Sequence, residues 1–106
     1  MTKAVMYWPG LRLEVKGHAD YAEKGKDIVC AAVSMLTGAL VGVLEEAQKR
    51  GRTMFEWKEN GADVVIWADP NMGTINEIKS YFRMAVKGLR MVAEQYPKYV
   101  EIKEVR

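Results

Sequence analysis

One long helical pattern in the last third of the chain limits the folds open to it. Between Thr74 and Pro97, apolar residues return every three or four positions, as on one face of an α-helix. Thr74 and Glu77 match a capping box at its start, and Pro97 ends it. The residues on this stripe are Ile75, Ile78, Phe82, Ala85, Leu89, Val92 and Tyr96. Such a helix is stable only when its apolar stripe is covered, so the rest of the chain has to supply a second layer.

Strand patterns supply that layer. The segments "KAVMYW" and "LRLEVKG" flank Pro9-Gly10, where proline suits the second position of a type II turn and glycine the third. A second hairpin is predicted where Glu59-Asn60-Gly61 separates "TMFEWK" from "ADVVIWAD", with Asn60-Gly61 as the turn signal. The tail "YVEIKEV" alternates and predicts a fifth strand.

Another helix is predicted over 28–49, after an exposed loop at 19–26 and with Asp27 as its N-cap. The element order is then β-β-α-β-β-α-β. This order is typical of an α+β fold in which two helices pack on one antiparallel or mixed sheet. We expect a single domain over residues 1–106.

Composition excludes several function classes. The chain has 106 residues, of which 49% are hydrophobic and 28% charged, as in a folded soluble protein. Its net charge of +2 is spread along the chain, so no nucleic-acid-binding face is expected. The N-terminal segment is neither a signal peptide nor a membrane span, and the single cysteine suits a reducing compartment. We therefore expect a cytoplasmic protein that does not contact a membrane.

The helix predicted over 28–49 is apolar around most of its circumference. Several of its stripes need cover, and a second copy of the chain is one way to provide it, so we expect a homodimer. A further stripe carries three small polar side chains: Cys30, Ser34 and Thr37, followed by Val41. This stripe fits either a cleft or a close helix contact in which the hydroxyls bond back to the helix backbone.

Cys30 and His18 are the only cysteine and histidine, twelve positions apart. With Asp27 as N-cap, Cys30 lies in the first helical turn, where free N–H groups and the helix dipole favour a thiolate. His18 follows the second strand and can reach that turn as a base. Helix N–H groups, including that of Cys30, are expected to hold the oxyanion of an acyl-transfer reaction.

Other interpretations of these residues stay open. A lone cysteine is often a buried core residue and a lone histidine a surface residue, which would make the chain a non-catalytic dimeric binding module. A redox-sensing thiol that does not depend on His18 is a third hypothesis. The nearby acidic residues do not have metal-ligand spacing, so no metal and no cofactor is expected. Trp8, Trp57 and Trp67 are candidates for an aromatic-binding pocket, but tryptophans on strands are more often core or sheet-face residues, so we place them outside the site.

The segment "GHADYAEKGKDIVCAAVS", residues 17–34, resembles the signature of the ribosomal-processing cysteine protease family. A weaker similarity lies in "GLRMVAEQYPKYVEI", residues 88–102. The resemblance implies that Cys30 is the nucleophile and His18 its general base, later the acid that protonates the leaving amine.

The supporting residues are Gly17, Gly25, Asp27 and Ser34. Asp27 and Ser34 occupy motif positions, and Asp27 is a candidate to orient His18 as well as to cap the helix. Ser34, one turn after Cys30, is expected to bond within the site or to support the backbone. Gly17 would permit a close backbone approach, and Gly25 would hinge a lid formed by loop 19–26.

Members of this family are similar in being homodimers that act in ribosome biogenesis. They remove a short N-terminal extension from the large-subunit ribosomal protein numbered twenty-seven, cutting after a pair of aromatic residues. Phage relatives trim capsid or scaffold proteins. The resemblance therefore implies a thiol endopeptidase with a protein or peptide substrate, and it leaves the ribosomal and phage substrates both open.

Overall fold

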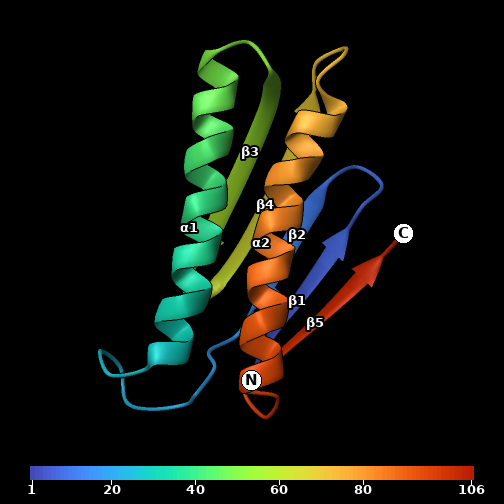
Figure 1. Cartoon of the computed structure of the whole chain (residues 1–106). Coiled ribbons are helices and arrows are strands. Elements are labelled where there is room, and N and C mark those ends of the chain that lie inside the picture. The colour runs from blue at the N-terminus through green and yellow to red at the C-terminus, as the bar shows by residue number, and fades with distance from the viewer.

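The computed structural model describes all 106 residues and places two helices on one face of a five-stranded sheet (Figure 1). The elements are β1 (Thr2–Tyr7), β2 (Arg12–Lys16), α1 (Ile28–Lys49), β3 (Thr53–Asn60), β4 (Asp63–Pro70), α2 (Ile75–Gln95) and β5 (Val100–Val105). The strand order is β3-β4-β2-β1-β5, with β5 parallel to β1 and the other neighbours antiparallel. The predicted α+β class and element order are confirmed, and the sheet is mixed.

Both predicted hairpins form. The Leu11 N–H donates to the Trp8 carbonyl at 3.2 Å, and Gly10 takes the positive φ of +81° that the turn requires. In the second hairpin Asn60 ends β3 and pairs with Asp63, so the two-residue connection is Gly61-Ala62, one residue later than the predicted Asn60-Gly61 pair. Gly61 takes the positive φ of +62° at the first position of this turn. These turns fix which side chains of each strand point toward the helices.

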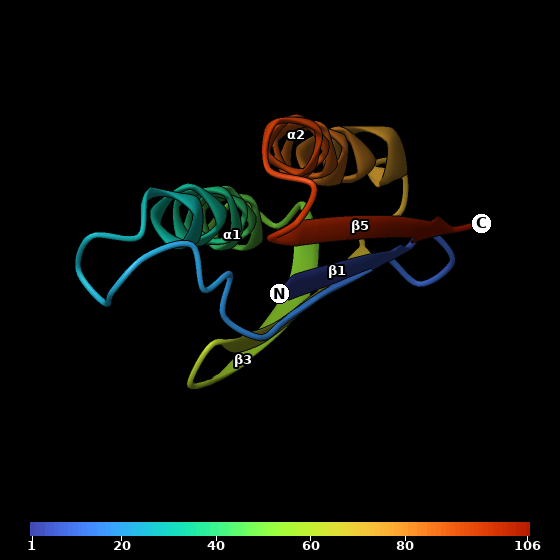
Figure 2. The ribbon, with the colours of Figure 1, turned by 90° about the horizontal axis from the view of Figure 1, so that it is seen from below.

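The core lies between the sheet and the helix layer. Figure 2 shows both helices on the same side of the sheet, so the opposite face is uncovered. Alternate strand residues supply the sheet side of the core: Ala4, Met6, Leu13, Val15, Ile66 and Ala68. Leu36 of α1 packs against Gly88 of α2, where an added Cβ would lie 2.3 Å from Leu36 Cδ2. The two helices therefore approach closely at Gly88.

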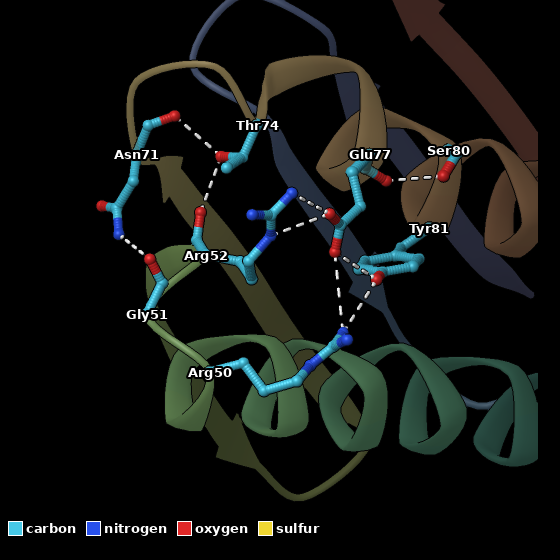
Figure 3. A network of polar contacts seen from close by, with 8 residues as sticks. All are labelled: Arg50, Gly51, Arg52, Asn71, Thr74, Glu77, Ser80 and Tyr81. Atoms are coloured by element: carbon cyan, nitrogen blue, oxygen red, sulfur yellow. Dashed lines mark hydrogen bonds and ion pairs between the residues drawn. The ribbon is translucent and has the colours of Figure 1, made fainter.

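The start of α2 differs from the predicted capping box. Thr74 is the N-cap, but its hydroxyl donates to the carbonyls of Arg52 and Asn71, at 2.6 and 2.7 Å, and caps no helix N–H group. Glu77 contacts Arg52 and Tyr81 instead of the helix terminus (Figure 3). The capping box is therefore wrong, because charged and phenolic donors compete successfully for the Glu77 carboxylate.

The apolar helix α1 meets the length and hydropathy criteria for a membrane span, with a mean hydropathy of 2.0 over 18 residues. The core helix of a soluble protein also meets these criteria, so they are weak evidence for a membrane. One side of α1 packs in the core, through Val29, Val33, Thr37, Leu40, Leu44 and Ala47. Only 28% of that window is buried in the fold, and side chains such as Ile28 and Met35 remain exposed.

Candidate active site

A cleft of about 430 Å³ opens between α1 and the sheet. The polar stripe of α1 forms one wall of it, with Cys30, Ser34, Thr37, Gly38 and Val41. Gly17 and His18, at the end of β2, line the same cleft. The structure thus brings the predicted thiol and imidazole into one cavity, and of the two interpretations of the stripe it supports the cleft.

Asp27 starts α1 as predicted. One carboxylate oxygen, Oδ1, accepts the N–H groups of Val29 and Cys30 at 3.0 and 2.9 Å. The other oxygen, Oδ2, accepts those of Tyr21 and Ala22 at 2.9 and 3.3 Å. Desolvation raises the pKa of Asp27, but the combined hydrogen bonds from Cys30, Ala22 and Tyr21 outweigh it and hold the pKa below its usual range. A single ionised carboxylate therefore joins the helix start to the preceding loop.

The loop 19–26 is anchored at its first half. It passes beneath the start of α1 in Figure 1. The Tyr21 ring makes edge contacts with Tyr96 and Tyr99, at centroid distances of 5.3 and 5.2 Å. Residues 22–26 are exposed, and Gly25 among them has a φ of +87° with no heavy atom near its Cβ position. The part of the loop that is free to rearrange is thus the part around Gly25.

The thiol of Cys30 is half-buried at the end of the cleft nearest the N-terminus of α1. The Ala19 N–H donates to Cys30 Sγ at 3.4 Å. The Ala19 side chain is almost fully buried, at 1% exposed, so its packing fixes the direction of this N–H group. A backbone donor therefore points at the sulfur from the segment that follows His18.

The predicted oxyanion donor needs a correction. The N–H group of Cys30, expected to hold an oxyanion, already donates to Asp27 Oδ1, as does that of Val29. Both are unavailable because the N-cap carboxylate occupies them. The Ala19 N–H, which no sequence pattern singled out, is the backbone donor directed at the reactive atom.

His18 is exposed, and its imidazole makes no hydrogen bond within the chain. It does not bond to Cys30 or to Asp27, so the expectation that Asp27 orients His18 is not met in this structure. Both Asp27 oxygens are engaged with backbone N–H groups, which explains why the carboxylate does not turn toward the imidazole. The imidazole is free to meet an incoming substrate.

Gly17 permits a close backbone approach, as predicted. It has a φ of +84°, and a Cβ there would lie 2.8 Å from the Met1 carbonyl oxygen. Its N–H donates to Asp63 Oδ1 at 2.9 Å, and its carbonyl accepts the Thr2 hydroxyl at 3.0 Å. The group it approaches is the N-terminal backbone, and these contacts fix the position from which His18 enters the cleft.

The two hydroxyls of the α1 stripe differ. Thr37 donates to the Ser34 carbonyl at 3.1 Å, so it bonds back to the helix backbone. The Ser34 hydroxyl is exposed in the cleft and makes no hydrogen bond there. Ser34 is therefore available to a bound molecule, whereas Thr37 is not.

The sequence interpretation missed the opposite wall of the cleft. Trp57 and Glu59 of β3 line it, although Trp57 was placed outside the site. Their spacing of two along a strand was visible in the sequence, but which face of β3 met the cleft depended on the packing of α1 over the sheet. No group of three or more His, Cys, Asp or Glu side chains in the chain is arranged to hold a metal ion.

Comparison with solved structures identifies the same fold. A crystal structure of the ribosomal processing protease Prp from S. aureus, with a covalently linked product peptide, matches with a TM-score of 0.76 at 21% identity. It covers 98% of this chain and 99% of that one. The same S. aureus protein with a substrate peptide gives a TM-score of 0.75 at 16% identity, with the same coverage. SMU.848 from Streptococcus mutans gives 0.68 at 26% identity, covering 98% of this chain and 91% of that one.

Comparison by sequence establishes the family. The model of the family described as cysteine protease Prp matches residues 10–101. The ribosomal processing cysteine protease Prp of Mycoplasma genitalium is 34% identical over 97 residues, covering 87% of this chain and 86% of that protein. On both grounds, the chain belongs to the Prp family of ribosomal processing cysteine proteases.

Proposed function

We propose that Cys30 is the nucleophile of this cysteine protease and that His18 is its general base. The observation that carries the proposal is the shared cleft, in which the Ala19 N–H points at Cys30 Sγ while the His18 imidazole is free. A thiol at the first turn of a helix, in the same cleft as a histidine, has the requirements of a Cys–His nucleophile. No other cysteine or histidine is present to take either role.

The reaction follows from these positions. His18 takes the thiol proton as Cys30 Sγ bonds to the scissile carbonyl carbon, and the proton then passes to the leaving amine as the C–N bond breaks. The Ala19 N–H points at the sulfur, so it stabilises the thiolate that attacks the carbonyl carbon. Water, deprotonated by His18, then hydrolyses the thioester and regenerates the thiol.

The supporting residues have narrower roles. Asp27 positions Cys30 and the loop through its backbone contacts. The free hydroxyl of Ser34 is a hydrogen-bonding group for bound peptide. Gly25 is the hinge of a lid, restricted to residues 23–26 because the Tyr21 ring is anchored against the end of α2 and the Ala22 N–H is bonded to Asp27. Gly17 fixes the approach of His18.

The proposed substrate is the N-terminal extension of a large-subunit ribosomal protein, the one numbered twenty-seven, cut after a pair of aromatic residues. The Mycoplasma genitalium relative is a ribosomal processing protease, and the S. aureus structures hold a substrate peptide and a covalently linked product peptide. These relatives support a peptide substrate that enters the cleft of this chain. A phage capsid or scaffold protein is the other substrate of this class.

A cytoplasmic homodimer is the proposed working state. The outer face of α1 exposes Ile28 and Met35, at 56% and 73%, and no charged residue lies between Asp27 and Glu45. A second copy would cover this face. Sedimentation velocity at micromolar concentration tests it: we expect a dimer that Met35→Lys shifts to monomer, and a wild-type monomer would contradict the proposal.

The test of the catalytic pair uses the ribosomal precursor protein with its extension. We expect Cys30→Ala and His18→Ala each to slow cleavage at least about 1,000-fold with an unchanged circular dichroism spectrum. Lys87→Ala, on the exposed side of α2, is the matched control and should cleave normally. Cleavage retained by pure Cys30→Ala protein would refute the assignment.

A second measurement separates a coupled pair from an isolated thiol. The rate of Cys30 alkylation against pH should change between the intact protein and His18→Ala, because a neighbouring imidazole alters the thiolate population. An alkylation profile that is the same in both proteins would favour a thiol that acts without His18.

A further inference from the structure

The wall of the cleft opposite α1 carries an unusual pair of side chains. Trp57 and Glu59 are two positions apart on β3, so both point to the same face of the sheet. Trp57 pairs in register with Ile66, and Glu59 pairs with Val64, which also lines the cleft. Ile66 is fully buried under the helices, so this is the helix-covered face. Both side chains therefore face the space in which Cys30 lies.

Neither side chain has a partner within the chain. The Trp57 side chain is 44% exposed and its indole N–H makes no hydrogen bond, whereas the Trp8 indole N–H donates to Glu104 at 2.9 Å. Glu59 forms no ion pair and is the only carboxylate that lines the cleft. No lysine or arginine lines it either. An apolar platform and a free negative charge are thus presented together to a ligand.

The positions along the cleft can be ordered. From Cys30 to Val41 the wall spans eleven helical residues, about 16 Å, which an extended peptide fills with roughly five residues. The Phe55 N–H donates to Gln48 Oε1 at 3.0 Å, so the first half of β3 lies against the last turns of α1. Glu59 pairs through Val64 with Val15, near the end of β2, whereas Trp57 pairs through Ile66 with Leu13. The segment that follows β2 contacts Cys30 through the Ala19 N–H, so Glu59 lies nearer to that end of the cleft than Trp57 does.

We propose that Trp57 and Glu59 select the substrate of the protease. Glu59 pairs with a lysine or arginine of the bound peptide, and Trp57 packs against an apolar side chain two positions farther from the scissile bond. The spacing of two follows because an extended peptide and β3 share the same side-chain period. This inference rests on the proposed function, since it takes Cys30 as the point of cleavage.

We expect removal of the Glu59 charge to have a small effect on peptide affinity and removal of the Trp57 ring to have a larger one. A solvent-exposed ion pair changes affinity by about three- to fivefold. Loss of an aromatic contact surface changes it by roughly tenfold or more. Trp57 and Glu59 therefore determine which peptides are cut and take no part in the bond-making steps at Cys30.

The first experiment maps cleavage sites. Wild-type protein, Glu59→Gln and Glu56→Gln are each incubated with a proteome-derived peptide library, and the cut sites are identified by mass spectrometry. Glu56 lies on the same strand but points to the opposite face, which makes it the matched control. We expect a basic residue enriched at one position within about five of the cut, lost in Glu59→Gln and kept in Glu56→Gln. The same residue preference in all three proteins would overturn the inference and leave the proposed function intact.

The second experiment needs no cleavage. Fluorescein-labelled peptides that carry Phe-Ser-Lys or the reverse, Lys-Ser-Phe, are titrated with Cys30→Ala protein, beside analogues with glutamine in place of lysine. We expect one lysine peptide to bind about three- to fivefold tighter than its glutamine analogue. This difference in affinity should disappear in protein that carries both Cys30→Ala and Glu59→Gln. Trp57→Thr should weaken binding about tenfold, and Trp67→Thr, on the uncovered face, should not. Equal affinities, or no binding of any peptide, would overturn the inference whether or not Cys30 is the nucleophile.

Discussion

The two helices begin with carboxylates that are used in opposite ways. Asp27, before α1, accepts four backbone N–H groups, two from the helix and two from the loop. Glu77, in the first turn of α2, accepts only side chains: Arg52 at 3.0 and 2.7 Å and the Tyr81 hydroxyl at 2.7 Å (Figure 3). The first arrangement fixes the main chain and leaves side chains free, whereas the second ties side chains together.

The two carboxylates lie at opposite ends of the helix layer, and the contrast between them matches what each end does. At the start of α1, His18 and Ser34 remain without partners inside the cleft, as a site that must bind substrate requires. At the start of α2, the joined side chains link α2 to the segment after α1, and Arg52 and Asn71 also accept bonds from Thr74 through their carbonyls. One end is suited to chemistry, and the other joins the segment between α1 and β3 to α2.

Removing the Asp27 carboxylate should have the largest effect of any substitution outside the catalytic pair. Asp27→Ala leaves four backbone N–H groups without their acceptor, so the start of α1 and the loop lose their fixed relation. We expect a ten- to hundredfold loss in kcat/KM, because small displacements of a nucleophile have effects of this size. Peptide cleavage and amide hydrogen exchange at residues 21–30 would measure it.

Asp27→Asn sharpens the same comparison. Its amide oxygen can still accept from Val29 and Cys30, but its NH₂ group cannot accept from Tyr21 and Ala22. We expect protection of the two helix amides to survive and that of the two loop amides to fall. Equal loss at both pairs would mean that the carboxylate acts through its charge and not through these bonds.

The fold was predictable because each element has its own local signal. The period of α2, the Pro9-Gly10 turn and the Asn60-Gly61 pair fixed element type and order without knowledge of distant contacts. The capping box at Thr74 failed because the Thr74 hydroxyl donates to the carbonyl of Asn71, three residues earlier, and to that of Arg52, which is distant in the sequence. A motif defined by local spacing does not include such tertiary competitors.

Neutralising Glu77 should affect stability and not activity. Glu77→Gln keeps the shape of the side chain but removes the charge that attracts Arg52. We expect the Tm to fall by a few degrees with kcat/KM unchanged, since the network lies at the opposite end of α1 from Cys30. If kcat/KM fell together with the Tm, the two ends of the helix layer would be energetically coupled. That result would contradict the separate roles assigned to the Asp27 end and the Glu77 end.

The stability difference between wild type and Glu77→Gln should depend on pH. Hydrogen bonds from Tyr81 and Arg52 hold the pKa of Glu77 below its usual range, against a smaller opposing effect of desolvation. A lowered folded-state pKa contributes stability that is present above the unfolded value, about 4.3, and is lost as pH falls through the folded value. Thermal unfolding should therefore show the two Tm values converging below about pH 4, and a constant gap would contradict this.

The candidate site was predictable only in part. Cys30, His18, Asp27 and Ser34 lie in one continuous segment whose spacing and resemblance point to a thiol site. Trp57 and Glu59 come from β3, about thirty positions later, and nothing in their own segment relates them to the thiol. The Ala19 N–H was missed for another reason: a backbone donor has no sequence signature, and its direction follows from how the Ala19 side chain is buried.

The smallest expected effect is a difference in Tm between variants of the two arginines that face Glu77, Arg50 and Arg52. Arg52 makes two well-formed bonds to Oε1, whereas the Arg50 guanidinium lies 3.6 Å from Oε2 and 3.5 Å from the Tyr81 hydroxyl. Exposed ion pairs contribute little unless their geometry is good, so Arg52→Gln should lower the Tm by a degree or two and Arg50→Gln should leave it unchanged. Differential scanning fluorimetry in low salt and in 0.5 M salt would compare them. If both variants lost the same Tm in low salt and neither lost any in 0.5 M salt, net charge and not hydrogen-bond geometry would hold this end together. The contrast between Glu77 and Asp27 would then no longer rest on hydrogen-bond geometry.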